Sequence, residues 1–151
     1  MKLLIMGPPG VGKGTQAERI RDYFDIAHLS TGDILRSEIE ARSSIGTEAK
    51  TYMNAGRLVL DEVLLKIVQE RITKPDCVKG YLLDGFPRTI PQAEGLEKIM
   101  TDLDHKLAAV ISLTADENEL VNRLVKRGQD SGRSDDTVSY THLTLPTNRE
   151  V

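Results

Sequence analysis

Short apolar runs alternate along the chain with segments in which apolar residues recur at helical spacing. Residues 2–6 (Lys-Leu-Leu-Ile-Met) show no alternation of polar and apolar positions, which is typical of a strand buried on both faces of a parallel sheet. Residues 15–24 instead place Ala17, Ile20 and Phe24 on one helical face, with charged side chains between them. A strand followed by a helix in this way is typical of α/β proteins.

The same pattern continues toward the C-terminal part of the chain. It predicts further strands at 26–29, 81–84 and 107–113, and further helices at 34–41, 46–54, 62–73, 91–100 and up to about residue 127. We expect 107–113 to be an unbroken buried strand, Asp61 to be the N-cap of the helix at 62–73, and Thr114 and Glu117 to form a capping box. Strands separated by helices predict an open parallel sheet, whose ligands bind at the carboxyl ends of the strands.

Composition and charge narrow the function classes. The chain has 151 residues and a formal net charge of −3, which favours one globular domain without a nucleic-acid surface. The single cysteine, Cys77, and the histidines His28, His105 and His142 lack metal-ligand spacing. We therefore interpret all four as structural or surface residues and predict no zinc site. The apolar start is too short for a signal peptide or a membrane span, which favours a cytoplasmic protein.

A glycine-rich loop at 7–15 (Gly-Pro-Pro-Gly-Val-Gly-Lys-Gly-Thr) follows the first strand and opens the first helix. Its glycines allow successive backbone N–H groups to face a phosphate, while the helix dipole and the Lys13 ammonium add positive charge. The alternative interpretation is a glycine-rich turn with an incidental lysine. The common phosphate-binding pattern places Ser or Thr directly after the lysine, whereas here Gly14 intervenes before Thr15.

This form of the loop resembles that of nucleoside monophosphate kinases, and further motifs resemble adenylate kinase signatures in family order. They are Leu-Ser-Thr-Gly-Asp at 29–33 with Arg36, Gly-Arg-Leu-Val at 56–59, Asp-Gly-Phe-Pro-Arg-Thr at 84–89 with Gln92, and Gly-Arg-Ser-Asp-Asp at 132–136. The resemblance covers residues 1–137. It implies a P-loop α/β/α fold of three layers with a parallel sheet, a helical AMP-binding flap at 30–59 and a short lid at 126–136.

The resemblance implies the reaction ATP + AMP = 2 ADP. The phosphate of AMP is already anionic, so such an enzyme positions and neutralises charge rather than supplying a strong base, and arginine forks suit that task. By resemblance, ATP-binding residues are Gly10, Val11, Gly12, Lys13, Gly14, Thr15, Arg123 and Arg127. Arg123 would stack on the ATP adenine, and the catalytic residues would be Lys13, Arg88, Arg127 and Arg133.

The resemblance also implies an AMP site. Its residues would be Thr31, Arg36, Arg57, Leu58, Val59, Gly85, Phe86, Pro87, Arg88, Gln92 and Arg133. Arg36 and Arg88 would hold the AMP phosphate, while the donor and acceptor of the Gln92 amide complement an adenine edge. The alternatives are a solvent-facing Gln92, and arginines that are solvated or form local ion pairs.

Two carboxylates are candidates for a magnesium site. Asp84 ends an apolar strand, where a carboxylate needs a cation, water or hydrogen-bond donors. We expect it to lie in the outer shell of a magnesium ion carried by ATP, with a cap of backbone N–H groups as the alternative. Asp33 either caps the following helix or joins the same outer shell.

After Thr137 we expect the resemblance to end. The final strand and helix of the family would be missing, residues 138–151 would be a foreign tail, and 107–113 would become an exposed apolar sheet edge. Two rival functions stay open: a nucleotide-binding fragment with little catalysis, and a kinase for another nucleoside monophosphate. A nucleic-acid ATPase or GTPase switch lacks supporting motifs. The partners implied are ATP, AMP and ADP, with no nucleic acid or membrane, and the family expectation is a monomer.

Overall fold

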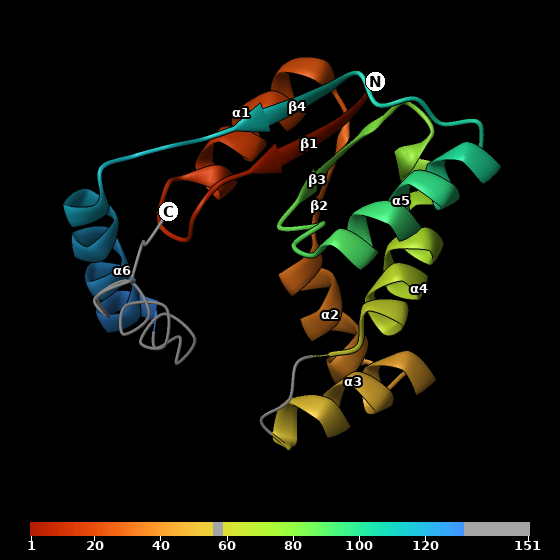
Figure 1. The fold of residues 1–151 in the computed structure, drawn as a ribbon, viewed down its shortest axis with the longest axis horizontal. Coiled ribbons are helices and arrows are strands. Elements are labelled where there is room, and N and C mark those ends of the chain that lie inside the picture. Colours follow the sequence, from red (N-terminus) through yellow and green to blue (C-terminus); the bar gives the residue numbers. More distant parts are fainter. Residues whose placement is uncertain (56–58, 132–151) are drawn as a thin grey trace. The chain divides into compact units, whose positions relative to one another are not determined.

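A computed structural model describes residues 1–55 and 59–131 of the protein (Figure 1). In chain order the elements are β1 (Lys2–Met6), α1 (Lys13–Phe24), β2 (Ala27–Ser30), α2 (Thr31–Glu40), α3 (Ser44–Asn54), α4 (Asp61–Ile72), a short 3-10 helix (Pro75–Cys77), β3 (Tyr81–Asp84), α5 (Ile90–Asp102), β4 (Ala109–Ser112) and α6 (Glu117–Ser131). The chain forms two compact units. The first comprises Met1–Met6 and Gly14–Ile111, and the second comprises Gly7–Lys13 and the residues from Ser112 onward.

The sheet lies in the first unit and has the order β2-β3-β1-β4. Both β1 and β2 run parallel to the central β3, with Ile5 and Ser30 each opposite Asp84. The carboxyl ends of three neighbouring strands therefore lie along one edge of the sheet. This arrangement confirms the predicted α/β fold and places the loops that follow these strands at the edge where ligands bind in such sheets.

Both faces of the two inner strands, β1 and β3, are buried, which explains why their sequences lack an alternating pattern. On one face, side chains of β1, β2 and β3 pack against α4 and α5, which lie side by side in Figure 1. This core contains Leu4, Leu29, Val68, Ile72, Cys77, Tyr81, Leu83, Phe86, Leu96, Ile99 and Met100. Leu3, Ile5 and Leu82 alternate with them and are also buried. A fully buried aliphatic side chain contributes about 2 kcal/mol.

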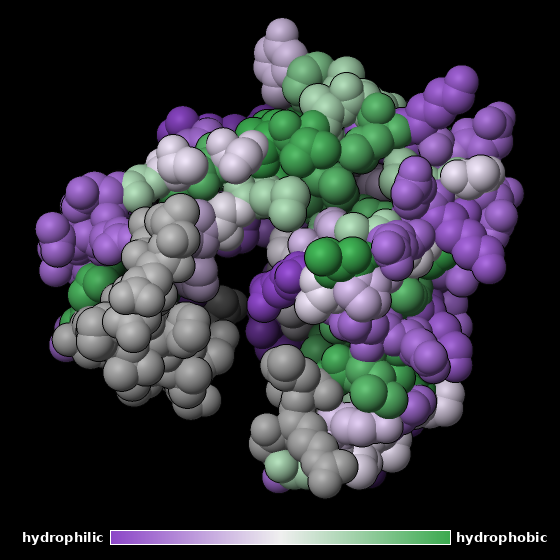
Figure 2. Space-filling view, in the orientation of Figure 1, coloured by the Kyte–Doolittle hydropathy of each residue, from purple (hydrophilic) through white to green (hydrophobic). Residues whose placement is uncertain are grey.

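The strand β4 corrects one expectation. We expected 107–113 to be buried, but β4 spans Ala109–Ser112 at the edge of the sheet, and Val110 is 52% exposed. A short apolar run has the same appearance whether its strand is central or at an edge, because its partners lie elsewhere in the chain. Figure 2 shows apolar surface over this part of the sheet. The expected exposed edge at this strand is therefore present among the described residues.

Two helix starts also differ from expectation. The N-cap of α4 is Leu60, while Asp61 is the first helical residue and its carboxylate contacts α5 instead. At α6, Oδ1 of Asp116 accepts the N–H of Asn118 at 2.9 Å, so Asp116 rather than Thr114 supplies the capping oxygen. The sequence offers polar residues near each helix start, but only the three-dimensional structure shows that Asp116 caps α6 and that no side chain caps α4.

Most of the helices are longer than expected, and two of these differences concern the candidate site. The helix α2 begins at Thr31, directly after β2, rather than at Ile34. The helix α6 continues to Ser131, so residues 126–131 of the expected lid are helical. The rest of the lid with Arg133, the flap residues Arg57 and Leu58, and the expected tail at 138–151 lie outside the described residues.

Candidate functional site

The carboxyl ends of β2 and β3 bring Thr31, Asp84, Gly85 and Arg88 together. Thr31 is 8% exposed, and its hydroxyl donates to the carbonyl oxygen of Asp84 at 3.3 Å. Gly85 has φ +82°, and a Cβ there would lie 3.2 Å from Oγ1 of Thr31 and 3.1 Å from Nη2 of Arg88. Glycine therefore permits both the backbone conformation and the close approach of these side chains.

The guanidinium of Arg88 is held through its Nε, while the side chain is exposed to solvent. Its Nε donates to the carbonyl oxygen of Gly85 at 2.7 Å, and its backbone N–H donates to Oε1 of Gln92 at 2.7 Å. The loop between them is anchored by Phe86, which is 2% exposed and belongs to the core, while Pro87 is partly buried. A cation fixed in this way at the end of a strand can meet an anionic ligand with little loss of side-chain entropy.

Arg36 has different neighbours. Its guanidinium pairs with the carboxylate of Asp33 and lies over Gly32, where its Nη atoms are 3.4 Å from the position a Cβ would occupy. The N-cap of α2 is Ser30, and Asp33 lies in the first turn of the helix, so Asp33 is not the cap. The Asp33–Arg36 pair is about half exposed, so it contributes at most about 1 kcal/mol, and a phosphate could displace the carboxylate.

The carboxylate of Asp84 has a partner that the sequence analysis missed. Its Oδ2 lies 3.1 Å from Nε2 of His28, and both side chains are largely buried. The sequence analysis interprets His28 as a structural or surface residue, and 56 residues separate it from Asp84 in the chain. The available signal was the strand register: His28 lies two residues before Ser30, which is opposite Asp84. Side chains two residues apart on a strand share one face.

The position of Gln92 excludes the alternative interpretation, in which its side chain faces solvent. It is 5% exposed, so it is not a solvent-facing helix residue. Its Nε2 donates to Oδ1 of Asp61 at 2.7 Å, in addition to the bond between its Oε1 and Arg88. Val59, the one residue of the 57–59 segment that is described, is partly buried.

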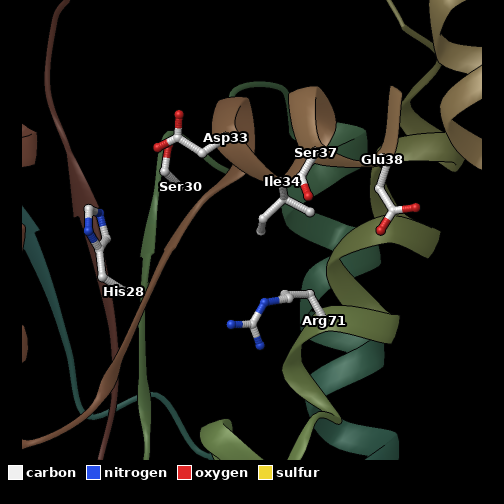
Figure 3. Close-up of a pocket in the computed structure, with 7 residues that line it drawn as sticks. All are labelled: His28, Ser30, Asp33, Ile34, Ser37, Glu38 and Arg71. Carbon is white, nitrogen blue, oxygen red and sulfur yellow. The ribbon is translucent and has the colours of Figure 1, made fainter. Parts of the chain in front are cut away.

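A cavity of about 290 Å³ opens beside these strand ends (Figure 3). It is lined by His28, Ser30, Asp33, Ile34, Ser37, Glu38 and Arg71, which come from β2, α2 and α4. Arg71 is held by Asp76 through two bonds of 2.8 and 2.6 Å, and this guanidinium lowers the pKa of the Asp76 carboxyl. The residues expected to contact AMP do not line this cavity, although His28 also holds Asp84.

In the second unit, the glycine-rich loop curls around the Lys13 ammonium. Nζ of Lys13 donates to the carbonyl oxygens of Gly7 at 2.8 Å and Pro8 at 3.2 Å. Gly12 has φ +96°, and no atom lies within 4 Å of a Cβ added there, so the loop is open at this point. Because α1 begins at Lys13, the N–H groups of its first turn, including those of Gly14 and Thr15, end the loop. This is the geometry of a phosphate-binding loop.

The helix α6 packs against the same loop. Its buried residue Leu124 has Cγ only 3.1 Å from the position of a Cβ at Gly10. Arg123 and Arg127 are four residues apart on this helix and therefore share one exposed face. Nε of Arg123 pairs with Oε1 of Glu119 at 2.8 Å, which is the local ion pair that the sequence analysis kept as an alternative.

Other classes of site find no support in the described part of the chain. Residues 1–55 and 59–131 contain no group of three or more His, Cys, Asp or Glu side chains that could hold a metal ion. Nor do they contain a helix that is long and apolar enough to cross a membrane.

The first unit thus carries arginine, threonine and amide groups at the carboxyl ends of parallel strands, and the second carries a glycine-rich loop that leads into the first turn of α1. Together with the sequence motifs, these parts define the class of P-loop phosphotransferases that act on nucleoside monophosphates. The family described as adenylate kinase matches residues 5–149. The chain belongs to the adenylate kinase family.

Similar proteins carry the same description. The adenylate kinase of Nocardioides sp. is 51% identical over 137 residues, which are 91% of this chain and 72% of that protein. The adenylate kinase of Carboxydothermus hydrogenoformans is 54% identical over 127 residues, covering 84% of this chain and 59% of that protein. The adenylate kinase of Leptospira biflexa serovar Patoc is 47% identical over an alignment of 153 residues, covering 96% of this chain and 82% of that protein.

These matches bear on the C-terminal residues. The family match ends at residue 149, and the Leptospira biflexa alignment includes 96% of the chain, so both continue past Thr137. We had placed the end of the resemblance at that residue, and the comparisons extend it. The chain spans between 59% and 82% of the length of the three relatives named above.

Proposed function

We propose that this chain binds ATP at the loop of residues 7–15 and AMP at the carboxyl ends of β2 and β3, and that it catalyses ATP + AMP = 2 ADP. The observation that carries the proposal is the cluster of Thr31, Asp84, Gly85, Arg88 and Gln92, built on two adjacent parallel strands. Membership of the adenylate kinase family supports the same reaction. By the same reasoning we propose a monomeric, cytoplasmic enzyme.

Charge placement is the main catalytic task in this reaction. The acceptor oxygen of AMP is already anionic, so the protein has to hold two polyanions and neutralise the charge that develops during transfer. In the proposal, Arg88 and Arg36 bind the AMP phosphate, and Lys13 follows the phosphoryl group that moves. Arg123 and Arg127 act on the ATP side, and Arg133 contacts AMP and the phosphoryl group that moves. The hydrogen bond from Nε of Arg88 to the Gly85 carbonyl supports the proposed role of Arg88, because it fixes the position of an exposed guanidinium.

Selection of AMP is assigned to Thr31 and Gln92. A carboxamide offers two N–H donors and two carbonyl lone pairs. One donor of Gln92 goes to Asp61 and one lone pair receives the Arg88 N–H, so one of each remains for an adenine edge. A uracil monophosphate presents an acceptor oxygen and an N–H donor in the opposite order and would leave these groups unpaired. Cytosine presents the same order as adenine, so its rejection is assigned to Thr31 and to the smaller size of its ring.

Magnesium fits the site as an ion carried by ATP. A nucleotide-bound Mg²⁺ keeps most of its waters and needs few protein ligands, so the single carboxylate of Asp84 suffices. Asp84 is 9% exposed and is oriented by His28, which matches an outer-shell role better than a solvated surface role. When bound, the ion would neutralise part of the charge on the transferring phosphoryl group.

The test is ADP formation by the 151-residue chain from ATP and AMP with magnesium, with omission of AMP and replacement by CMP as controls. We expect AMP-dependent turnover, and a loss of about 10²-fold or more in kcat/KM for AMP in Arg88→Ala. Arg19→Ala, an exposed arginine on α1, is the matched control and should be unaffected. Folded protein that binds AMP without turnover would contradict the proposal and select the nucleotide-binding alternative. Equal turnover of AMP and CMP would contradict the assigned acceptor.

A further inference from the structure

The first residue of α4 is bonded to the first turn of α5. Oδ1 of Asp61 accepts a hydrogen bond from Nε2 of Gln92 at 2.7 Å, and Oδ2 accepts one from the hydroxyl of Thr89 at 3.3 Å. Thr89 is the N-cap of α5, and its hydroxyl oxygen in turn accepts the backbone N–H of Gln92 at 3.3 Å. The single carboxylate of Asp61 therefore holds both the side chain and, through Thr89, the backbone of Gln92.

These contacts leave only one orientation for the Gln92 amide. A carboxylate can only accept, so Asp61 requires the NH₂ group on its side. The backbone N–H of Arg88 can only donate, so it requires the carbonyl oxygen on the other side, where Oε1 lies at 2.7 Å. Exchanging the two ends of the amide would place oxygen against oxygen and N–H against N–H. Both bonds would be lost at a position that is 5% exposed, where unpaired polar groups are costly.

A fixed orientation matters because adenine and hypoxanthine present the same groups in opposite order. The adenine edge has an N–H donor on the exocyclic nitrogen and an acceptor at N1. Hypoxanthine has an acceptor oxygen in place of the amino group and an N–H donor at N1. An amide that could turn over would match either base, whereas an amide locked in one orientation matches only one order.

We propose that Asp61 is a positioning residue that locks the Gln92 amide and thereby makes the site prefer a 6-amino purine monophosphate over a 6-oxo purine monophosphate. This inference rests on the proposed function, in which Gln92 contacts the base of AMP. Asp61 acts without touching the nucleotide, through its two bonds to α5. The negative charge of Asp61 in the first turn of α4 also stabilises the helix through its dipole, but Glu62 places a second negative charge in the same turn. The structure thus offers a neighbour that separates the two roles.

The test uses Asp61→Asn, which keeps the shape of the side chain but can face Gln92 with either a donor or an acceptor. Its matched control, Glu62→Gln, removes an equal charge from the same helical turn. In Asp61→Asn we expect the KM for AMP to rise about tenfold and the ratio of kcat/KM for AMP to that for IMP to fall about tenfold, with kcat changed less than about threefold. The KM for ATP should not change, and Glu62→Gln should behave like the unsubstituted chain.

A double-mutant cycle shows whether Asp61 acts through Gln92. In a Gln92→Ala background, Asp61→Asn should produce no further change in the AMP to IMP ratio, because no amide remains to be oriented. If the AMP to IMP ratio were unchanged in Asp61→Asn, the inference would be overturned. The proposed function would not be affected, provided that the unsubstituted chain turns over AMP. A full effect of Asp61→Asn in the Gln92→Ala background would also overturn it.

Calorimetric titration of the same proteins with AMP and IMP separates this inference from the proposed function. AMP binding without turnover would contradict the proposed function, and the AMP to IMP binding ratio would still decide the role of Asp61. A folded chain that binds neither nucleotide would overturn both. A measurement on the unsubstituted chain guards against misfolding of Asp61→Asn: ¹⁵N relaxation should show a rigid side-chain amide at Gln92, with an order parameter of about 0.8, and a flexible one at the exposed Gln16. A flexible Gln92 amide would overturn the inference.

Discussion

The hydroxyl of Tyr81 lies 3.1 Å from Nδ1 of His105, which joins the start of the central strand to the segment that leads into β4. Tyr81 is fully buried, and burial raises its pKa to about 12. Burial, together with the nearby Lys2 ammonium, lowers the pKa of His105 below its usual value of 6.5. Both shifts mean that the fold favours the neutral forms of these two side chains.

The free energy of unfolding should therefore depend on pH through His105. Well above pH 6.5 the histidine is neutral in both states, and its contribution to stability is complete. As the pH falls below that value, the unfolded chain gains a proton that the folded chain resists, so stability decreases until the pH drops below the folded pKa. Urea unfolding from about pH 8 to pH 5 measures this slope.

His105→Gln is the matched variant for this prediction, because a glutamine amide does not titrate and can pair with the Tyr81 hydroxyl as either donor or acceptor. Part of the decrease in stability between about pH 7 and pH 5 should disappear in this variant. An identical slope in both proteins would show that His105 does not carry the pH dependence.

A second prediction concerns Gly85. In Gly85→Ala the new methyl group would meet Thr31 and Arg88 at 3.2 and 3.1 Å, at a residue with φ +82°. We expect a loss of about 1–2 kcal/mol in stability from the backbone conformation, and displacement of the arginine. Steady-state kinetics should show a KM for AMP that rises at least about tenfold while the KM for ATP is little changed. A rise in the KM for ATP of the same size would contradict the local effect.

A third prediction concerns Lys13. Lys13→Met removes the ammonium but retains an unbranched chain of similar length, so the fold should persist while kcat falls about 10²-fold or more. Stopped assays of ADP formation measure the loss, and circular dichroism confirms folding. Lys98→Met, on the exposed side of α5, is the control and should keep its activity. A Lys13→Met protein with normal kcat would remove Lys13 from the catalytic residues.

The positions of the strands were predictable because the relevant information is local. Residues 2–6 and 81–84 are apolar without alternation, and both are strands buried on two faces. The strand at 109–112 has an equally apolar sequence but lies at the edge of the sheet. Nothing within the strand itself distinguishes these two cases, because the number of neighbouring strands is decided by distant parts of the chain.

The candidate site was predictable to a similar degree. Asp84 and Arg88 stand directly after a strand, where a parallel sheet forms its ligand sites, and the structure brings them together with Thr31. The bonds from Asp84 to His28 and from Asp61 to Gln92 span 56 and 31 residues and depend on strand register and helix packing. The motifs therefore indicated candidate residues for the site, whose roles stay predictions, but they did not indicate the neighbours that orient them.

The final prediction concerns the exposed edge at β4. An edge strand presents unpaired backbone groups, and Val110 adds apolar surface there, so this edge should promote non-specific aggregation of the monomeric chain at high concentration. Val110→Lys should reduce concentration-dependent association in sedimentation velocity experiments and change the free energy of unfolding by less than about 1 kcal/mol, since Val110 is half exposed. The control is Val78→Lys, which adds the same charge at a residue that is 83% exposed but lies outside the strands. If both lysines reduced association equally, net charge rather than the strand edge would be the cause. A reduction confined to Val110→Lys would identify β4 as the surface through which copies associate.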